Sequence, residues 1–302
     1  MLAFDRIVFP TDFSETARAA LPYASFLAAR HGATLHLLHV ESVPRAPSIK
    51  ESLPRTDTEL DECARQASQQ FGVEASELDE SQLVRATRSG PSVRDVVADY
   101  AEEVEADLIV MGTARRRGLS SLFPQSTAAD VIRYAPCPVL TVLDDADVAL
   151  APVRTILVPH DFSEHADHAL HYAQELAQLY DADILPVHVI EELTVPVVYE
   201  VEPTEVDTER VRERTTSALR DATNVRDVRV VSGHAGRRLV EVAEEEDVDL
   251  VVLATHGRTG LSRMLLGSVA ETVIRRAPCP VFTVKATPTS DEIPPDADDA
   301  GR

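Results

Sequence analysis

Lysine is almost missing from this chain. Its 302 residues include 29 lysines and arginines, of which only Lys50 and Lys285 are lysines, against 51 aspartates and glutamates; the net charge is −22. This excess of negative charge argues against nucleic acids and anionic membranes as partners, because their phosphate groups repel it. An acidic, lysine-poor surface also suggests adaptation to high salt, where screening shortens the electrostatic range. We therefore hypothesise a halophilic cytoplasm as its environment.

Long apolar segments and cysteine patterns are missing as well. No apolar run approaches the ~20 residues that a membrane-spanning helix needs. The N-terminus leads directly into a predicted strand, without a targeting segment, so we predict a cytoplasmic protein. The three cysteines, Cys63, Cys137 and Cys279, have neither metal-ligand nor redox-pair spacing. Because Cys137 and Cys279 occupy matching positions in a repeat, we interpret them as small buried residues.

Catalytic motifs are also scarce. The chain has no nucleophile elbow, no Walker pattern and no lysine in its glycine-rich loop. His165, His168 and His171 recur at three-residue spacing on one predicted helix, which suggests a metal site. This spacing rotates the side chains around the helix, however, so a partly solvated face is the favoured interpretation and we predict no metal. We expect no catalytic residue and, at most, slow ATP hydrolysis.

The sequence does contain an internal repeat of domain size. Residues 7–15, IVFPTDFSE, return as residues 156–164, ILVPHDFSE, and the APCPV segment at 135–139 returns at 277–281. Each copy is long enough to bury its own core. We predict one domain over residues 1–145, a second over 153–286, and a disordered tail rich in proline and aspartate over 287–302.

Apolar runs that fit strands alternate with helix patterns in each copy. The predicted strands cover residues 6–10, 34–40, 82–86, 107–111 and 139–143 in the first copy, and 155–159, 183–189, 227–231, 249–253 and 281–285 in the second. A helix is predicted over 14–31, with Ser14 as N-cap, and again over 163–180. Alternating strands and helices require crossover connections. The pattern predicts an α/β fold of two tandem, doubly wound, five-stranded parallel sheets of Rossmann-like type, with ligands beyond the carboxyl ends of the strands.

A glycine-rich loop in the second copy has the order expected of a phosphate cradle. The loop runs from Ala254 to Gly260 and continues to Gly267 and Ser268, between an apolar run at 250–253 and a helix-like stretch at 269–276. Glycines that take positive φ let backbone N–H groups approach a ligand, and Ser268 would begin a helix whose dipole favours negative charge. An ordinary strand-to-helix turn is the alternative interpretation.

Taken together, these motifs resemble the universal stress protein family in its tandem two-domain form, over nearly the whole chain. The resemblance rests on the Pro-x-Asp-Phe-Ser turn after the first strand of each half and the His-Val end of the second strand. It also rests on the THGRTG loop at 255–260 and the Pro-Cys-Pro-Val segment before the last strand. Family members that bind ATP carry Gly, two residues, Gly, nine residues, then Gly and Ser or Thr. The second half matches this pattern except that Ala254 replaces the first glycine.

The resemblance implies an adenine-nucleotide site in the second half, for ATP with or without Mg²⁺, or for ADP or AMP. Asp161 would contact the ribose and the backbone of Val189 the adenine. The phosphates would be held by Gly257, Gly267, Ser268 and the amide of Val269, and we assign to the same site Pro159, His160, Ala254, His256, Arg258 and Gly260. An alternative role for Asp161 is structural, as a turn residue that caps the next helix, and the two roles are compatible. Alanine at 254 costs little if its φ is negative.

The first half departs further from the family pattern. Its equivalent positions are Asp12, Val40, Gly112, Arg115 and Ser126. Arg115 replaces the second glycine and Gln125 the third, so side chains would stand where the pattern brings phosphate against bare backbone. We therefore predict a degenerate or vacant site. The run 115–117 of three arginines could attract an anion itself, but a surface cluster is the favoured interpretation.

Three functions follow as hypotheses. The leading one is a nucleotide-binding protein of stress response or signalling, whose ligand state changes a surface that an unknown protein partner recognises. The second is a scaffold of the same fold without nucleotide in either half. The third is a slow ATPase or phosphotransfer enzyme in which His256 or Asp161 does chemistry. The resemblance also implies that the final strands of the two domains pair around a two-fold axis, as an internal pseudo-dimer; further oligomerisation is left open.

Overall fold

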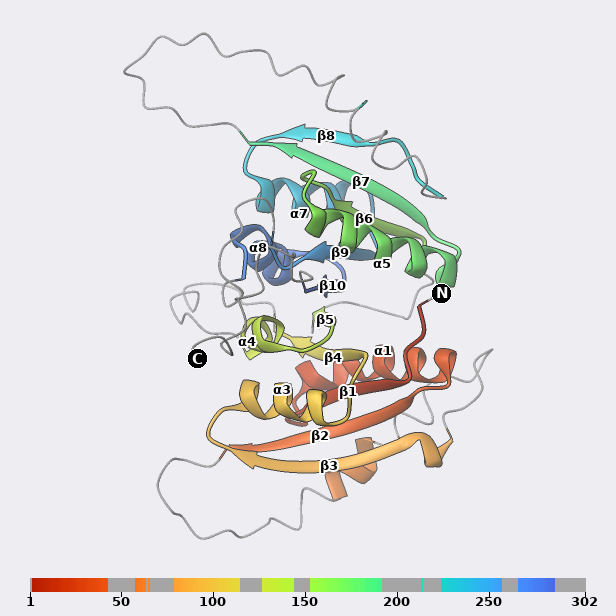
Figure 1. The fold of residues 1–302 in the computed structure, drawn as a ribbon, viewed down its shortest axis with the longest axis vertical. Helices are drawn as coiled ribbons and strands as arrows, with labels where there is room; N and C mark the ends of the chain where they lie inside the picture. Colours follow the sequence, from red (N-terminus) through yellow and green to blue (C-terminus); the bar gives the residue numbers. More distant parts are fainter. Residues whose placement is uncertain are drawn as a thin grey trace, which may run out of the picture.

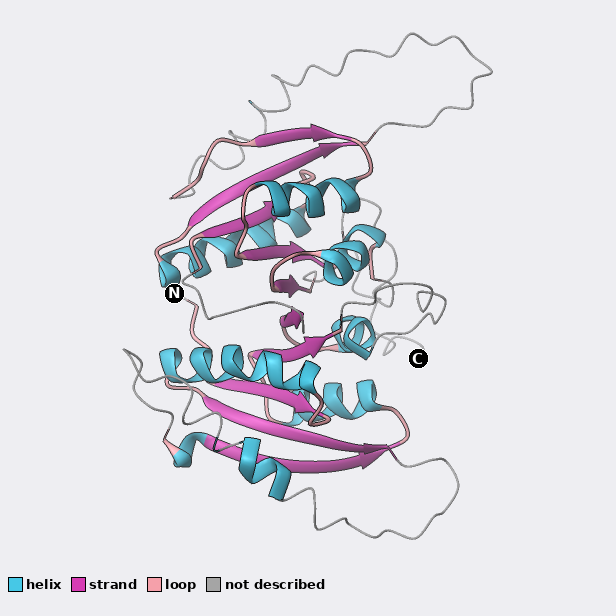
Figure 2. Ribbon diagram, turned by 180° about the vertical axis from the view of Figure 1, so that it is seen from behind, coloured by secondary structure: helices cyan, strands magenta, loops and turns pink. Residues whose placement is uncertain are grey.

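A computed structural model describes residues 2–42, 58–63, 65, 79–114, 127–143, 153–191, 213, 224–256 and 266–285. The two copies form one continuous sheet of ten strands, flanked by helices on both faces (Figures 1 and 2). Both the predicted linker around 144–152 and the predicted disordered tail at 287–302 lie outside the described residues. Among the described residues, no helix combines the length and the apolar character that crossing a membrane requires.

The first copy alternates strand and helix as predicted. Its elements are β1 (Arg6–Thr11), α1 (Glu15–His31), β2 (Thr34–Ser42), the short 3₁₀ helix η1 (Glu80–Gln82), β3 (Leu83–Gly90), α3 (Val93–Glu103), β4 (Leu108–Thr113), α4 (Thr127–Tyr134) and β5 (Val139–Leu143). The second copy consists of β6 (Thr155–Pro159), α5 (Glu164–Tyr180), β7 (Asp183–Ile190), β8 (Arg229–Ser232), α7 (Ala235–Glu245), β9 (Leu250–Ala254), α8 (Ser268–Arg276) and β10 (Val281–Val284). Every strand lies within a few residues of its predicted position, so the fold class is confirmed.

The sheet has the order β3-β2-β1-β4-β5-β10-β9-β6-β7-β8. All pairs within a copy are parallel, and the copies join through the antiparallel pair β5–β10, in which Leu140 lies opposite Phe282. Figure 1 shows this pair in the middle of the molecule, with β3 and β8 at opposite ends. The two predicted five-stranded parallel sheets are therefore halves of one mixed sheet, because the last strand of each copy hydrogen-bonds to the free edge of the other.

Two apolar layers cover the sheet, and each layer continues across both copies. One contains the buried faces of α1 and α5, with residues such as Leu21 and Leu176. The other contains the buried faces of α3, α4, α7 and α8, with residues such as Val131 and Val273. Since both layers span the β5–β10 junction, the hydrophobic effect holds the two copies together as well as each copy separately.

The first helix of each copy starts at the predicted cap. The Ser14 hydroxyl accepts a hydrogen bond from the Ala17 amide at 3.2 Å, and the Ser163 hydroxyl accepts one from the Ala166 amide, also at 3.2 Å. Each serine satisfies an amide that the first helical turn leaves without a partner. The repeat therefore preserves the turn after the first strand together with its cap.

Threonine hydroxyls form a symmetric pair of hydrogen bonds across the junction between the copies. Thr141 on β5 donates to the carbonyl of Val281 at 3.2 Å, and Thr283 on β10 donates to the carbonyl of Val139 at 3.0 Å. Lys285 adds a bond from its ammonium group to the carbonyl of Ala135, at 3.0 Å. The junction is thus bonded through side chains as well as through the strand ladder, as an internal pseudo-dimer requires.

The cysteines at matching positions are free thiols, as expected. Cys279 is buried and Cys137 is half-buried. Burial raises the pKa of both thiols to about 12. Such thiols remain protonated and unreactive near neutral pH.

Candidate functional site

A pocket of about 540 Å³ opens at the carboxyl ends of β6, β7 and β9 in the second copy. The strands β6 and β9 are neighbours at the point where the strand order reverses, since β7 and β8 follow on one side and β10 on the other. Open α/β sheets bind ligands at this position because the crossover helices diverge there. The lining residues are Pro159, His160, Asp161, Ala166, His188, Val189, Ile190, Glu191, Ala235, Leu239, Leu253, Ala254, Thr255, His256, Gly267, Ser268, Val269 and Ala270.

The predicted site residues of the second copy that the structure describes all line this pocket. They come from four separate segments: Pro159, His160 and Asp161; Val189; Ala254 and His256; and Gly267, Ser268 and Val269. The other predicted residues of the loop, Gly257, Arg258 and Gly260, lie outside the described residues. The fold therefore brings together residues that are more than 100 positions apart in the sequence.

The turn after β6 presents Asp161 to the pocket. One carboxylate oxygen, Oδ1, accepts hydrogen bonds from the amide of Ser163 at 3.1 Å and from its hydroxyl at 2.5 Å. Ser163 in turn caps α5. Asp161 therefore supports the cap of the helix, as its alternative interpretation proposed, and the same bonds fix the orientation of its carboxylate at the pocket.

Val189 lies where β7 extends past the end of β6. The amide of His160 donates to the carbonyl of Val187 at 2.9 Å, so the polar backbone groups of Val187 face β6. Backbone orientation repeats every two residues in a strand, so the N–H and C=O of Val189 face the same side. The strand β6 has ended at Pro159, opposite Val187. A donor and an acceptor from Val189 are thus directed toward the pocket side of the sheet.

The N-terminus of α8 forms another wall. Gly267 precedes the helix with φ −61° and ψ 144°, and no side chain among the described residues caps this end. Gly267 does not use the positive φ that glycine can take, and its amide donates to the Thr255 carbonyl at 2.9 Å in ordinary extended geometry. A Cβ at this position would lie 3.2 Å from the same carbonyl oxygen. The glycine keeps this end of the helix free of side-chain bulk, next to Ser268 as predicted.

Ala254 ends β9 without strain, since it is absent from the residues of positive φ. The condition under which alanine is tolerated there is thus met. Its counterpart Gly112 is needed for a different reason: a Cβ on Gly112 would lie 1.9 Å from the carbonyl oxygen of Thr16 on α1. Close approach of the helix to β4, and not a special backbone angle, requires glycine in the first copy.

Carboxylates and histidines supply the polar chemistry of the described lining. Asp161 and Glu191 bring two carboxylates to the pocket. His256 contacts the hydroxyl of Thr255 through Nδ1 at 3.1 Å, and its ring centre lies 6.4 Å from that of His165 on α5. Within the described parts of the chain, no group of three or more histidine, cysteine or acidic side chains could hold a metal ion.

Sequence reasoning missed several lining residues. Glu191, Ala235 and Leu239 were overlooked because they follow β7 or lie on α7 and belong to no motif. His188 was seen only as part of the repeated His-Val motif, and its side chain proves to be buried at the pocket. Strand alternation together with the repeat could have identified His188.

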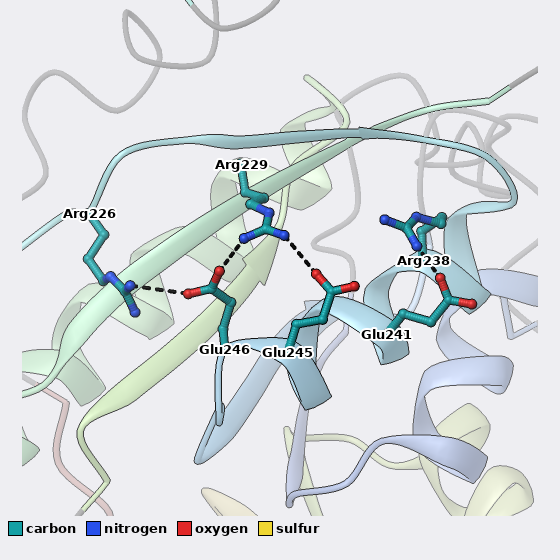
Figure 3. Close-up of polar contacts among 6 residues, drawn as sticks. All are labelled: Arg226, Arg229, Arg238, Glu241, Glu245 and Glu246. Atoms are coloured by element: carbon teal, nitrogen blue, oxygen red, sulfur yellow. Dashed lines mark hydrogen bonds and ion pairs between the residues drawn. The ribbon is translucent and has the colours of Figure 1, made fainter.

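An ion-pair network holds α7, one wall of the pocket, against β8 (Figure 3). Arg229 of β8 pairs with Glu245 at 2.7 Å and also with Glu246, which in turn pairs with Arg226 at 3.2 Å. Arg238, near the start of α7, pairs with Glu241. Such partly exposed pairs contribute little individually, but as a network they favour one orientation of the helix.

The first copy places its predicted equivalents at matching strand ends. Asp12 follows β1, Val40 lies near the end of β2 and Gly112 lies near the end of β4, whereas Arg115 and Ser126 lie outside the described residues. A separate pocket of about 290 Å³ in this copy includes none of the three described residues. It is lined by Phe9, Thr11, Phe13, Arg18, Thr58, Glu59, Glu62 and Cys63.

Comparison with known proteins places this geometry in a family. The model of the universal stress protein family matches residues 3–142 and again 152–285. A universal stress protein of Mycolicibacterium smegmatis is 27% identical over 290 residues, which cover 92% of this chain and 96% of that protein. The crystal structure of one from Archaeoglobus fulgidus covers 93% of this chain and 98% of its own, with a TM-score of 0.61 and 22% identity, a likeness of fold. A universal stress protein solved in complex with cAMP covers 48% of this chain and 100% of its own, at 23% identity and a TM-score of 0.38.

Proposed function

Because the chain belongs to the universal stress protein family, we propose that it binds an adenine nucleotide in the pocket at the carboxyl ends of β6, β7 and β9. The observation that carries this proposal is the gathering of the described predicted residues, from four segments, around this one pocket. We further propose that the nucleotide binds mainly in the second copy, and that its presence is recognised by a protein partner in stress response or signalling.

Each part of the pocket suits one part of such a ligand. The carboxylate of Asp161, held in place by Ser163, accepts hydrogen bonds from ribose hydroxyls. The N–H and C=O of Val189 match the acceptor and donor that adenine presents on one edge. The N-terminus of α8, at Gly267, Ser268 and Val269, where the glycine supplies no side-chain cap, attracts phosphate through its amides and its dipole.

The charge of the pocket bears on which nucleotide is favoured. Asp161 and Glu191 are both acidic and the whole chain carries a net charge of −22. A triphosphate therefore enters most favourably together with Mg²⁺, which offsets the phosphate charge. We expect the affinity for ATP to depend on Mg²⁺ and the affinity for AMP to depend on it much less.

The test is mass spectrometry of small molecules released when the purified protein is denatured, with the amount measured per chain, from protein prepared at high salt. We expect about one adenine nucleotide per chain. Two per chain would contradict the assignment of the first copy as vacant. None, with no binding in titrations of AMP, ADP, ATP with Mg²⁺ and cAMP, would favour the scaffold hypothesis, and steady phosphate release from ATP would favour the slow ATPase.

The acidic surface leads to a further expectation about salt. Repulsion among the excess carboxylates opposes the folded state, and added salt screens it. We expect the melting temperature to rise between 0.1 M and 2 M KCl, which scanning calorimetry measures. Full folding and full ligand binding in low-salt buffer would contradict the proposed adaptation to high salt.

A further inference from the structure

His188, near the end of β7, is bonded to the turn that carries Asp161. Its side chain is buried, and its Nδ1 atom lies 2.7 Å from the main-chain carbonyl oxygen of His160. A carbonyl oxygen can only accept, so Nδ1 carries the proton and donates. The amide of His160 meanwhile donates to Val187. Residues 187 and 188 of β7 thus bind both backbone polar groups of the residue that precedes Asp161.

The same histidine packs against the residue that follows Asp161. Phe162 has φ 66°, in the left-handed region that side chains other than glycine seldom adopt. Its ring centre lies 4.8 Å from that of His188. A strained backbone persists where its surroundings determine it. His188 therefore supports the turn on both sides of Asp161, through a hydrogen bond at residue 160 and a ring contact at residue 162.

The first copy contains the same arrangement. Nδ1 of His39 lies 2.9 Å from the carbonyl oxygen of Thr11, Phe13 has φ 62°, and the rings of Phe13 and His39 are stacked with centres 4.7 Å apart. Two copies that differ in most of their residues keep this contact. The repeated contact explains why the Pro-x-Asp-Phe-Ser turn and the His-Val strand end occur together.

We propose that His188 is a positioning residue for the nucleoside end of the pocket. It holds the carboxylate of Asp161 at a set distance from the backbone of Val189, which follows His188 on β7. The ribose and the adenine can then be bound at the same time. This inference rests on the proposed nucleotide site, since it names a residue that organises that site.

The test compares three variants of the full chain. His188→Leu removes the donor. His188→Asn keeps an N–H donor, on a nitrogen that is the same number of covalent bonds from Cα as Nδ1 of histidine. His39→Leu removes the equivalent donor from the first copy. We expect His188→Leu to lower the affinity for adenosine, AMP and ADP by the same factor, about tenfold. His188→Asn should recover most of that loss. His39→Leu should lower the denaturation midpoint by an amount similar to His188→Leu and leave nucleotide affinity within about twofold of the unchanged chain.

Isothermal titration at high salt measures these affinities, and ¹⁵N NMR of the imidazoles measures the tautomer. Unchanged affinity in His188→Leu, equal weakening in His39→Leu, or a loss confined to ligands with phosphates would overturn the inference. A His188 ring that is protonated only at Nε2 would overturn the inference whether or not the chain binds a nucleotide, because Nδ1 could not then donate to the His160 carbonyl. If the unchanged chain binds no adenine ligand although Nδ1 of His188 is protonated, the proposed function is overturned. His188 would then support the turn alone, which contradicts its role in positioning a ligand.

Discussion

The two copies of this chain share the contacts that form the fold and differ in the contacts that surround the pocket. In both, an aspartate before the fourth strand binds the amides at the start of the first strand: Asp107 binds Arg6 and Asp249 binds Thr155, each at 2.9 Å. At the end of that fourth strand, however, Gly112 of the first copy is replaced by Ala254. Contacts that determine the backbone path are thus repeated, as is the histidine contact at the turn after the first strand, whereas this position at the end of the fourth strand has diverged.

A second difference lies inside the core. His36 on β2 and Tyr100 on α3 form a buried hydrogen bond of 2.9 Å between Nδ1 and the phenol oxygen. The equivalent positions of the second copy hold Leu185 and Val242, both buried. A polar pair and an apolar pair therefore serve the same place in one fold. The fold thus accepts either a hydrogen-bonded pair or a smaller apolar pair at this place.

The largest expected effect comes from filling the end of α8. Gly267→Leu places a side chain at the pocket without straining the backbone, because φ is −61°. We expect nucleotide affinity to fall about a hundredfold, or ~2.7 kcal/mol, in isothermal titration. Gly267→Ala is the matched control, because its methyl group makes the same close contact with the Thr255 carbonyl, at 3.2 Å, without the rest of the leucine side chain. Tight binding at one site per chain in Gly267→Leu would place the ligand elsewhere.

The aspartates of the two turns should differ in their effect on binding. Asp161→Asn keeps an oxygen for the amide of Ser163 but loses the charge that strengthens a bond from a ribose hydroxyl. We expect a loss of affinity of about tenfold. Asp12→Asn makes the same change in the first copy, where the amide of Ser14 donates to Asp12 at 3.0 Å, and should leave affinity unchanged. Equal losses in the two variants would show that both copies bind nucleotide.

Acid should destabilise the chain through the polar pair that only the first copy contains. Burial lowers the pKa of His36 below its ordinary value, with a smaller effect from Arg6. The unfolded chain therefore binds a proton more readily than the folded one, and stability falls as the pH drops below about 6.5. Replacing His36 and Tyr100 by Leu and Val, as in the second copy, should reduce this fall.

Urea denaturation at pH 7.5 and at pH 5.5 measures the effect. The double variant should be less stable than the parent at pH 7.5, because valine leaves part of the volume of the Tyr100 side chain unfilled. The difference in stability between the two should be smaller at pH 5.5, because the variant lacks the histidine whose protonation destabilises the parent. The same acid-induced loss in variant and parent would exclude His36 as its source.

The smallest effects are expected at the junction, where the copies are equivalent. Thr141 and Thr283 are buried, and each donates one hydrogen bond to the opposite strand. Thr141→Val and Thr283→Val should each lower the free energy of unfolding by about 1 kcal/mol. Chemical denaturation measures both. A clear inequality would show that the junction lacks the two-fold symmetry of its hydrogen bonds.

Most of the fold could be predicted because its signals are local and occur twice. The apolar runs, the serine caps and the Pro-x-Asp-Phe-Ser turn each depend on neighbouring residues, and the repeat allowed every assignment to be checked against its copy. Motifs at strand ends also named nine of the residues that line the second-copy pocket, from Pro159 to Val269, and their role in binding a nucleotide stays a prediction. Glu191 and Leu239 were missed, because a side chain that lines a pocket from a separate segment leaves no local pattern.

The sequence by itself determined the order of strands and helices, the two-copy organisation and the side of the sheet at which a ligand is expected. Periodicity, capping and turn chemistry act over a few residues, so they are encoded where they act. Only the tertiary structure decided that Gly267 has ordinary backbone angles, that the close approach of α1 requires Gly112, and that His188 supports the Asp161 turn. Those outcomes depend on distances between segments far apart in the chain, and packing, not local preference, sets such distances.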